Sequence, residues 1–213
     1  MPQARDVNER IGELGVVPMI AIDDAAAALP LADALIAGGL PIAEITFRTA
    51  AAAEVIAALR AERPDLLVGA GTILTVENLR RASDCGAQFG VSPGLNPAVV
   101  AEARKIAFAF APGVMTPTDV EAAMMMGLSV LKFFPAEAVG GAKTLKSLAA
   151  PYAHTVLKFI PTGGINQNNA GDYLAMDCVL AVGGSWIAGR DAIAAGDWET
   201  IERNARAARK LSK

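Results

Sequence analysis

Two stretches that begin alike, VLKFFPAEAV (130–139) and VLKFIPTGGI (156–165), decide the fold of this 213-residue chain. Each starts with a short apolar run that is interrupted by a single lysine. Runs that are nearly continuous in apolar residues, without strict alternation, are typical of parallel strands covered on both faces. The two stretches therefore predict two parallel strands, each followed by a loop.

Similar runs precede and follow these two, and longer Ala-rich segments with helical patterns separate them. The predicted strands are 16–22, 42–47, 66–71, 89–92, 108–112, 130–134, 156–160 and 179–182. The predicted helices are 25–31, 50–61, 75–84, 97–104, 117–126, 141–149, 167–174 and 197–211. Side chains that favour helix starts stand at Asp24, Thr75, Asn96 and Thr116. Glycines that favour helix ends stand at Gly38–Gly39, Gly86 and Gly127.

Eight strand–helix units in so short a chain predict an α/β fold of the (β/α)8 TIM barrel type, smaller than the usual ~250 residues. An open doubly wound sheet is the alternative, but the composition break or glycine-rich first turn that usually accompanies it is missing from the sequence. No Pro/Ser-rich linker divides the chain. We therefore expect one domain over 1–213, with an extra N-terminal helix over 1–14 and the barrel over 15–213.

The composition narrows the class of protein. Hydrophobic residues make up 53% and charged residues 19%, which argues against disorder. A net charge of −3 leaves no basic stripe for nucleic acid or a membrane surface. Residues 1–14 carry several charges and do not read as a signal peptide, and no apolar stretch reaches the ~20 residues of a membrane span. Cys85 and Cys178 are too few for a disulfide framework or a zinc site, so we expect a cytoplasmic protein.

Lys132 lies inside the apolar run of the sixth strand. A buried, unpaired ammonium is costly, and burial favours the neutral amine. A neutral amine attacks ketones and forms a Schiff base. An interior ion pair, or a side chain that extends outward to solvent, explains this lysine equally well. The nucleophile, the ion pair and the outward side chain therefore all stay open as interpretations at this point.

Lys158 occupies the same position in the seventh strand and competes with Lys132 for that role. The loop after it, Thr162-Gly163-Gly164, is suited to present N–H groups to a phosphate, and Gly183-Gly184-Ser185 after the eighth strand matches it. In TIM barrels, phosphates favour the loops after strands seven and eight. The reacting carbonyl would then lie farther across the mouth, which favours Lys132.

Strand two contributes Glu44, Thr46 and Arg48, which share one parity and can project from one face. Arg48 can grip a carboxylate with two hydrogen bonds, and Glu44 can transfer protons. A local salt bridge is the structural alternative. Thr72, after strand three, can add a donor to the same carboxylate, although helix capping explains Thr72 alone better.

Other conspicuous residues point to no chemistry. His154 precedes the seventh strand, at the end of a barrel opposite the catalytic one. Glu137 is a second candidate base, but a carboxylate at a helix start explains it. Met124–Met126 fit helix packing, and Ser92-Pro93-Gly94 and Pro112-Gly113 fit tight turns that leave room for a ligand. No cluster has metal-ligand spacing, so we expect no metal and no cofactor.

Together these motifs resemble the 2-keto-3-deoxy-6-phosphogluconate (KDPG) and 4-hydroxy-2-oxoglutarate (KHG) aldolases. The resemblance runs from about residue 12 to the C-terminus. The motifs that carry it are Glu44-Ile-Thr-Phe-Arg48-Thr49, Gly69-Ala-Gly-Thr72, Val91-Ser-Pro-Gly94, Lys132-Phe-Phe-Pro-Ala-Glu137, Pro161-Thr-Gly-Gly-Ile165 and Gly183-Gly-Ser-Trp186.

The resemblance implies a class I aldolase on a (β/α)8 barrel, a homotrimer that needs no metal. It implies cleavage of KDPG to pyruvate and glyceraldehyde 3-phosphate in the Entner–Doudoroff pathway. Lys132 would then be the Schiff-base lysine and Glu44 the general acid/base. The implied substrate-binding residues are Arg48 and Thr72 at the carboxylate, Pro93 and Phe134 along the pocket, Thr162 near the sugar hydroxyls, and Gly163, Gly164, Gly184 and Ser185 at the phosphate.

Two alternatives keep the chemistry and change the substrate, to KHG or to the galactonate-series epimer of KDPG. A phosphosugar isomerase or epimerase barrel is a more distant alternative, since it also uses phosphate loops but needs no buried lysine. A barrel that only binds sugar phosphates is the third, and the intact motifs argue against it.

Overall fold

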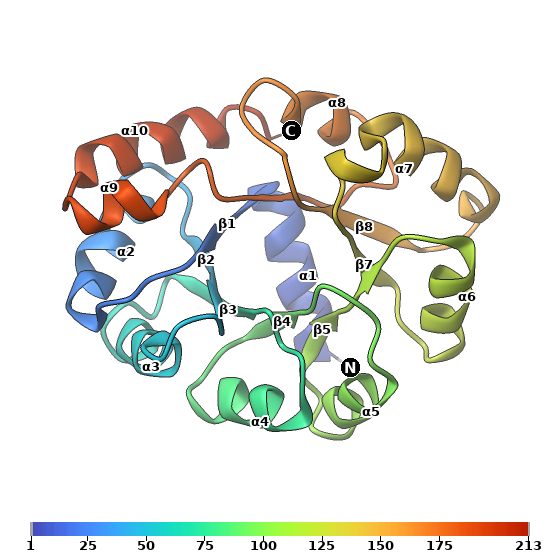
Figure 1. Ribbon diagram of the computed structural model, residues 1–213, viewed down its shortest axis with the longest axis horizontal. Coiled ribbons are helices and arrows are strands. Elements are labelled where there is room, and N and C mark those ends of the chain that lie inside the picture. The colour runs from blue at the N-terminus through green and yellow to red at the C-terminus, as the bar shows by residue number, and fades with distance from the viewer. Residues whose placement is uncertain (1, 213) are drawn as a thin grey trace.

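The strands line the middle of the molecule and the helices lie outside them, as the computed structural model shows for residues 2–212, with side chains from Asp6 on (Figure 1). The strands are β1 (Val16–Ile20), β2 (Ile42–Thr46), β3 (Leu67–Gly71), β4 (Phe89–Val91), β5 (Ala109–Ala111), β6 (Gly113–Val114), β7 (Val130–Phe133), β8 (Lys158–Pro161) and β9 (Val182–Gly184). The α-helices are α1 (Pro2–Leu14), α2 (Ala28–Ala37), α3 (Ala52–Glu62), α4 (Val76–Asp84), α5 (Pro97–Lys105), α6 (Pro117–Met125), α7 (Gly141–Ala149), α8 (Ala170–Leu174), α9 (Arg190–Ala194) and α10 (Trp198–Arg209). Three short 3-10 helices complete the described elements: η1 (Ala25–Ala27), η2 (Glu137–Val139) and η3 (Ala150–Tyr152).

All strand pairs are parallel, and the α/β class expected from the sequence is confirmed. Six strands form one curled sheet in the order β5-β4-β3-β2-β1-β9, and three form a second in the order β6-β7-β8. Two isolated bridges, Phe159↔Val179 and Thr162↔Gly183, link β8 to the segment around β9. Because all of these strands run in parallel, their carboxyl ends lie at the same edge of each sheet.

The predicted strand 108–112 is divided in the structure. Pro112 separates β5 from β6 because it has no N–H to donate to a neighbouring strand. Its carbonyl still accepts the N–H of Lys132 at 2.9 Å, so the chain passes directly from one sheet to the other. The predicted strand 179–182 is also shifted, since β9 begins only at Val182.

The predicted helix starts are confirmed. The side chains of Asp24, Thr75, Asn96 and Thr116 each accept a backbone N–H at the start of a helix. Such caps satisfy donors that have no partner inside the helix. Gly39, Gly86 and Gly127 adopt the positive φ that ends a helix, as expected.

Several boundaries differ from the predicted ones. The segment predicted as one helix over 25–31 is η1 followed by α2, which extends to Ala37. The predicted strand 156–160 begins at Lys158, since Val156 is 80% exposed. Helix α9 was not predicted, because five residues are too few to show a helical period.

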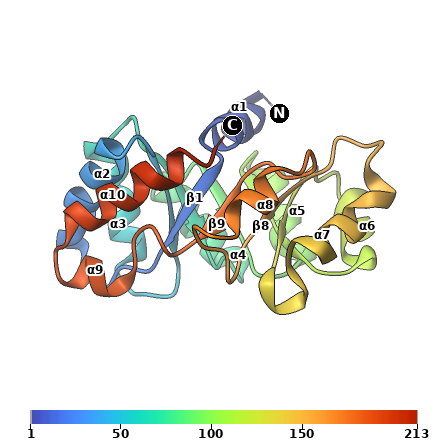
Figure 2. The ribbon, with the colours of Figure 1, turned by 90° about the horizontal axis from the view of Figure 1, so that it is seen from above.

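Helix α1 lies behind the strands in Figure 1 and along one side of the molecule in Figure 2. It contacts β1 and β5 and buries Val7 and Ile11. The face at which the strands end lies on the opposite side and is free of this helix (Figure 2). Among the described residues, no helix is long and apolar enough to cross a membrane.

Candidate active site

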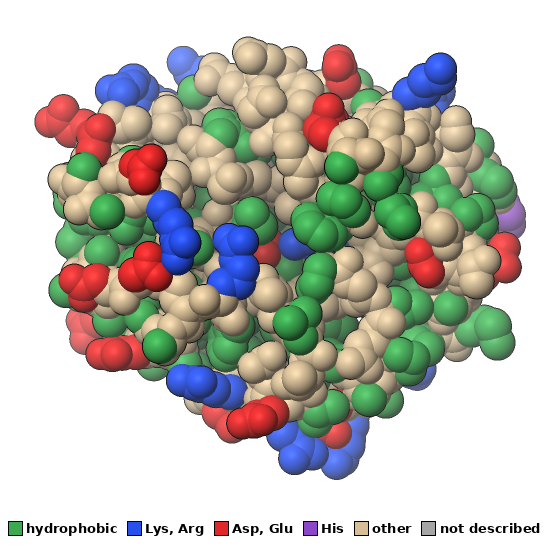
Figure 3. Space-filling model, viewed as in Figure 1, with side chains coloured by type: hydrophobic (Ala, Val, Ile, Leu, Met, Phe, Trp, Pro, Cys, Tyr) green, Lys and Arg blue, Asp and Glu red, His purple; other side chains and the backbone are tan. Residues whose placement is uncertain are grey.

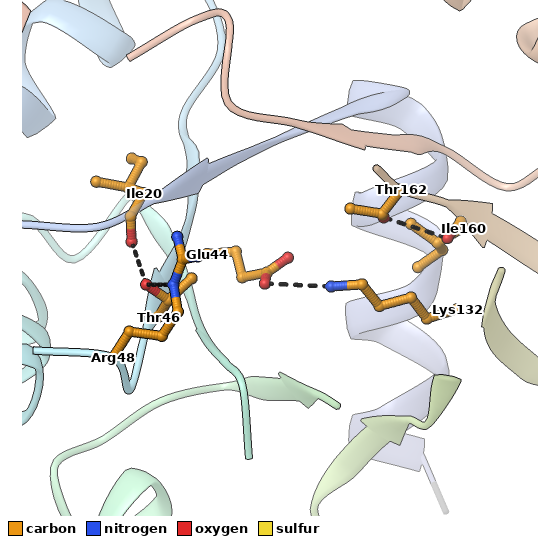
Figure 4. A network of polar contacts seen from close by, with 7 residues as sticks. All are labelled: Ile20, Glu44, Thr46, Arg48, Lys132, Ile160 and Thr162. Carbon is orange, nitrogen blue, oxygen red and sulfur yellow. Dashed lines mark hydrogen bonds and ion pairs between the residues drawn. The ribbon is translucent and has the colours of Figure 1, made fainter. Parts of the chain in front are cut away.

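Two charged side chains meet inside the molecule. Nζ of Lys132, from β7, lies 3.5 Å from Oε1 of Glu44, from β2 (Figure 4). Lys132 is 4% exposed and Glu44 is 3% exposed, and they are the only charged side chains in the buried set among residues 6–212. Burial of charge is expensive unless a function retains it, so this pair marks the candidate site.

The strand register explains why Lys132 points inward. Its neighbours Leu131 and Phe133 are fully buried, and because side chains alternate along a strand, they lie on the opposite face of β7. In the sheet, Lys132 pairs with Gly113 on one side and Ile160 on the other. Its amine also lies 5.7 Å from the centre of the Phe134 ring, within reach of a cation–π contact.

Glu44 reaches the interior because β3 leaves room for it. A Cβ atom at Gly71 would lie 2.1 Å from Oε1 of Glu44. Any other residue at Gly71 would therefore displace the carboxylate. In the sequence, Gly71 is part of the motif Gly69-Ala-Gly-Thr72. Only the structure shows that a glycine at this position makes room for the carboxylate of Glu44.

The contact excludes one of the three alternatives left open for Lys132. A side chain that extends outward to solvent is wrong, since the lysine is buried. The interior ion pair is present, and its partner is a carboxylate suited to receive the proton of the amine. A separation of 3.5 Å is long for a charge-assisted hydrogen bond, so the pair is loosely joined.

Lys158 lies elsewhere. The register pairs Lys132 with Ile160, which places Lys158 two residues, or about 7 Å, nearer the start of the strands. Its Nζ donates to the carbonyl of Asp177 at 2.6 Å. It lines a separate hollow of about 660 Å³ together with Tyr152 and Cys178. The structure therefore places the two lysines apart, with Lys132, the one favoured from the sequence, next to Glu44.

Arg48 is held at the mouth by Thr46. Its Nε donates to Oγ1 of Thr46 at 3.4 Å, and that hydroxyl donates to the carbonyl of Ile20 at 3.1 Å (Figure 4). The local salt bridge between Glu44 and Arg48 is not formed, since the ion pair of Glu44 in the described chain is with Lys132. Figure 3 shows basic side chains on the left of the middle of this face and hydrophobic side chains on its right.

Thr72 does not cap a helix. The residue that caps α4 is Thr75, so the capping interpretation of Thr72 is wrong. Thr72 directly follows β3 and has a φ of 59°, a left-handed conformation that is costly for a β-branched residue. Strained backbone of this kind concentrates at ligand sites, which fits the alternative interpretation as a substrate contact.

The two glycine loops lie side by side. Thr162 forms an isolated bridge with Gly183, and a Cβ atom at Gly183 would lie 2.4 Å from Oγ1 of Thr162. Gly163 and Gly164 have φ values of 104° and 79°. Ser185 directly follows β9 and is exposed. The predicted phosphate-binding residues are therefore brought together at one edge of the mouth.

Other expected positions can be placed as well. The carbonyl of Pro93 packs against Gly113, whose Cβ would lie 2.0 Å from it. His154 is exposed and precedes β8, as expected for a residue outside the site. Burial raises the pKa of the Cys178 thiol, which disfavours its reactive thiolate.

The partner of Glu137 was not predicted from the sequence. Its carboxylate accepts a hydrogen bond from the hydroxyl of Tyr173, which lies in α8. A single tyrosine in a predicted helix carries no pattern that would point to this contact. Glu137 is thus engaged by Tyr173 and differs from Glu44, which faces the lysine.

A parallel α/β fold with a lysine and a carboxylate buried side by side is the arrangement expected of the class of Schiff-base aldolases. The chain belongs to the KDPG and KHG aldolase family, whose family model matches residues 7–204.

Relatives agree with this family over most of the chain. The 2-dehydro-3-deoxy-phosphogluconate aldolase of Haemophilus influenzae is 48% identical and covers 93% of both chains. The KHG/KDPG aldolase of Escherichia coli K12 is 42% identical, over 91% of this chain and 90% of its own.

Two solved structures are similar throughout. The KDPG aldolase of Zymomonas mobilis ZM4, with 3-phosphoglycerate, has a TM-score of 0.91 at 39% identity and covers 99% of this chain and 98% of its own. The KDPG aldolase of Legionella pneumophila, with pyruvate captured as a covalent carbinolamine, has a TM-score of 0.90 at 35% identity. That match covers 97% of this chain and 98% of the other.

Proposed function

We propose that this chain cleaves KDPG to pyruvate and glyceraldehyde 3-phosphate through a Schiff base on Lys132. The observation that carries the proposal is the buried contact of 3.5 Å between Lys132 and Glu44, at the end of the strands where the two glycine loops meet. The family assignment supports the reaction, and the geometry supplies a nucleophile beside a proton acceptor.

The first step joins substrate and enzyme. The neutral amine of Lys132 attacks the C2 ketone, and loss of water leaves a protonated imine. Glu44 is the nearest group that can take a proton from the amine and return it to the departing hydroxyl. Burial of both groups strengthens this exchange because little water competes for the proton.

The second step breaks the carbon chain. Glu44 removes the proton of the C4 hydroxyl, the C3–C4 bond breaks, and its electron pair moves into the imine as an enamine. Glyceraldehyde 3-phosphate leaves as the aldehyde. Glu44 then returns the proton to C3, and hydrolysis releases pyruvate and restores the amine of Lys132.

The remaining residues bind the substrate in this proposal. Arg48 and Thr72 hold the carboxylate next to C2, and the Arg48 guanidinium is already oriented by Thr46. Phe134 and Pro93 line the pocket. The remaining contacts, to the sugar hydroxyls and the phosphate, come from Thr162, Gly163, Gly164, Gly184 and Ser185.

The proposal extends to the assembly. We take the two sheets as one closed (β/α)8 barrel, because the bridges from β8 to β9 and the passage through Pro112 join their edges. We also propose a single domain over 1–213 that forms a homotrimer, acts in the cytoplasm and needs no metal or cofactor. The resemblance to the family supports these points.

KHG is the second candidate substrate, since the Escherichia coli relative is named for both substrates. The galactonate-series epimer of KDPG is a third, and differs only at the hydroxyl that Glu44 would deprotonate. Turnover measured on the three acids ranks them. Preference for the phosphorylated gluconate-series acid is the expected result.

Trapping with borohydride tests the chemistry. The full-length protein is incubated with pyruvate and borohydride, and peptides are mapped by mass spectrometry. We expect an adduct on Lys132 that is lost in Lys132→Arg, with Lys158→Arg as the matched control that retains it. An adduct on Lys158, or none on the unchanged protein, contradicts the proposal.

A further inference from the structure

A hydrogen bond between the buried Tyr173 and the exposed Glu137 plays no part in the proposed reaction. Tyr173 is fully buried in α8, and its hydroxyl donates to Oε1 of Glu137. Burial, and next the hydrogen bond to the carboxylate, raise the pKa of Tyr173, so the phenol keeps its proton and acts as a donor. A bond to a carboxylate is among the stronger hydrogen bonds in proteins.

Glu137 packs directly on the glycine loop. A Cβ atom at Gly164 would lie 2.6 Å from Cβ and 2.8 Å from Cγ of Glu137, so the backbone of Gly164 rests on the stem of that side chain. The N–H of Glu137 donates to the carbonyl of Gly163 at 3.0 Å. A displacement of Glu137 would therefore move both glycines.

Two asparagines hold the loop from its other end. The side-chain amides of Asn166 and Asn169 donate to the carbonyl of Gly164 at 3.4 and 3.3 Å. Asn169 also accepts the backbone N–H of Asn166 at 2.8 Å. The carbonyls of both glycines therefore accept hydrogen bonds, that of Gly163 from the N–H of Glu137 and that of Gly164 from the two asparagine amides.

These bonds orient the N–H groups of the loop. In a trans peptide the C=O and N–H point in opposite directions. The bond from Glu137 to the Gly163 carbonyl therefore directs the N–H of Gly164 away from Glu137. The bonds from the asparagines direct the N–H of Ile165 away from them in the same manner. Within residues 2–212, neither N–H donates to another backbone group.

We infer that Tyr173 and Glu137 are positioning residues that hold these two N–H groups for the substrate phosphate, and that they thereby set the preference for phosphorylated over unphosphorylated keto acids. The inference rests on the proposed function, because it takes the loop over 163–165 as the phosphate site. Successive N–H groups in a glycine turn form a concave site suited to an anion. Tyr173 contributes at a distance, by preventing rotation of Glu137.

The test compares phosphorylated and unphosphorylated substrates on Tyr173→Phe. We expect the KM for KDPG to rise roughly tenfold with kcat nearly unchanged, because binding of the phosphate is lost equally in the ground and transition states. Turnover of KHG, which has no phosphate, should stay the same. Tyr152→Phe is the matched control, since it removes the other tyrosine hydroxyl of the chain, near the surface.

Substitutions at Glu137 provide a second test that leaves the buried tyrosine in place. Glu137→Gln retains an acceptor for the Tyr173 hydroxyl and should keep the KM for KDPG close to that of the unchanged protein. Glu137→Ala should raise it at least as much as Tyr173→Phe does. Thermal unfolding of each variant verifies that the protein is folded.

Several results overturn the inference. Equal loss on KDPG and KHG in Tyr173→Phe would indicate a purely structural role, and no loss on either would indicate no role. Ser185→Ala distinguishes a failure of this inference from a failure of the proposed phosphate site. A raised KM for KDPG in Ser185→Ala without one in Tyr173→Phe contradicts this inference alone, whereas no effect in either variant also contradicts the proposed phosphate site.

Discussion

Nζ of Lys132 and Oε1 of Glu44 lie 3.5 Å apart in the interior, although 88 residues separate them along the chain. Neither side chain has an appreciable contact with water. Removal of two charges from water costs several kcal/mol each, and their attraction only partly offsets that cost. The pair is therefore retained at the expense of stability.

The double variant Glu44→Leu/Lys132→Met should test this trade-off. Apolar side chains of similar size avoid the desolvation cost, so we expect the free energy of unfolding to stay equal or rise by about 1 kcal/mol or more. The single variant Lys132→Met leaves a buried carboxylate without its partner and should lose about 3 kcal/mol. Urea unfolding measures both, and a double variant clearly less stable than the unchanged protein would contradict the expected cost of the buried pair.

Thr46 should control how firmly Arg48 holds a carboxylate. Thr46→Val keeps the shape of the side chain but removes the hydroxyl that accepts from Arg48. We expect the dissociation constant of pyruvate to rise about fivefold, since one net hydrogen bond contributes about 1 kcal/mol. Calorimetric titration, or the pyruvate dependence of trapping, measures it.

Thr49→Val is the matched control for that variant. Its hydroxyl donates to the carbonyl of Ile22 at 2.6 Å, much as Thr46 donates to Ile20, whereas the hydrogen bond of the Arg48 side chain is to Thr46. Both variants remove a threonine hydroxyl near the end of β2. If they weaken pyruvate binding equally, Thr46 has no specific role in holding the arginine.

Gly71→Ala should displace the carboxylate of Glu44 while leaving the glutamate itself unchanged. The added Cβ would lie 2.1 Å from the carboxylate oxygen, so the side chain must move away from Lys132. We expect turnover to fall about a hundredfold, within the range for loss of a general acid/base. Gly171→Ala is the control, because the space around its Cβ is open, and it should retain full turnover.

Local features of the fold were the most predictable from the sequence. The caps at Asp24, Thr75 and Asn96 depend on a few neighbouring residues, and all three are formed. The break at Pro112 was missed, because whether a proline ends a strand depends on which neighbour requires its N–H. The short helix α9 lacked the length needed for a period.

The residues of the candidate site were predictable from the sequence, but which side chains contact one another was less so. Parity placed Glu44 and Arg48 on one strand face, but the partner of Glu44 is Lys132, across the interior. The glycine loops already favoured Lys132 over Lys158, but the offset between the two lysines required the register of β7 and β8, which apolar runs do not specify. The contact between Tyr173 and Glu137 spans 36 residues and depends on packing of α8.

Asp119, in the first turn of α6, should make the free energy of unfolding decrease at acid pH. Burial raises the pKa of Asp119, but hydrogen bonds from the N–H groups of Met115 and Thr116 outweigh it and leave the pKa below its usual value. Because the folded pKa is lower than the unfolded one, the carboxylate stabilises the protein at neutral pH. That stabilisation begins to fade below the unfolded value, near pH 4, and is lost as pH falls through the folded pKa.

Asp119→Asn should therefore lower the free energy of unfolding by about 1 kcal/mol at pH 7 and by less near pH 3, where the unchanged protein has already lost the charge. The capping hydroxyl of Thr116, which accepts the N–H of Asp119, stays in place in this variant. Urea unfolding at both pH values measures the two differences. A loss that is the same at pH 3 and pH 7 would mean that the charge of Asp119 contributes nothing to the free energy of unfolding.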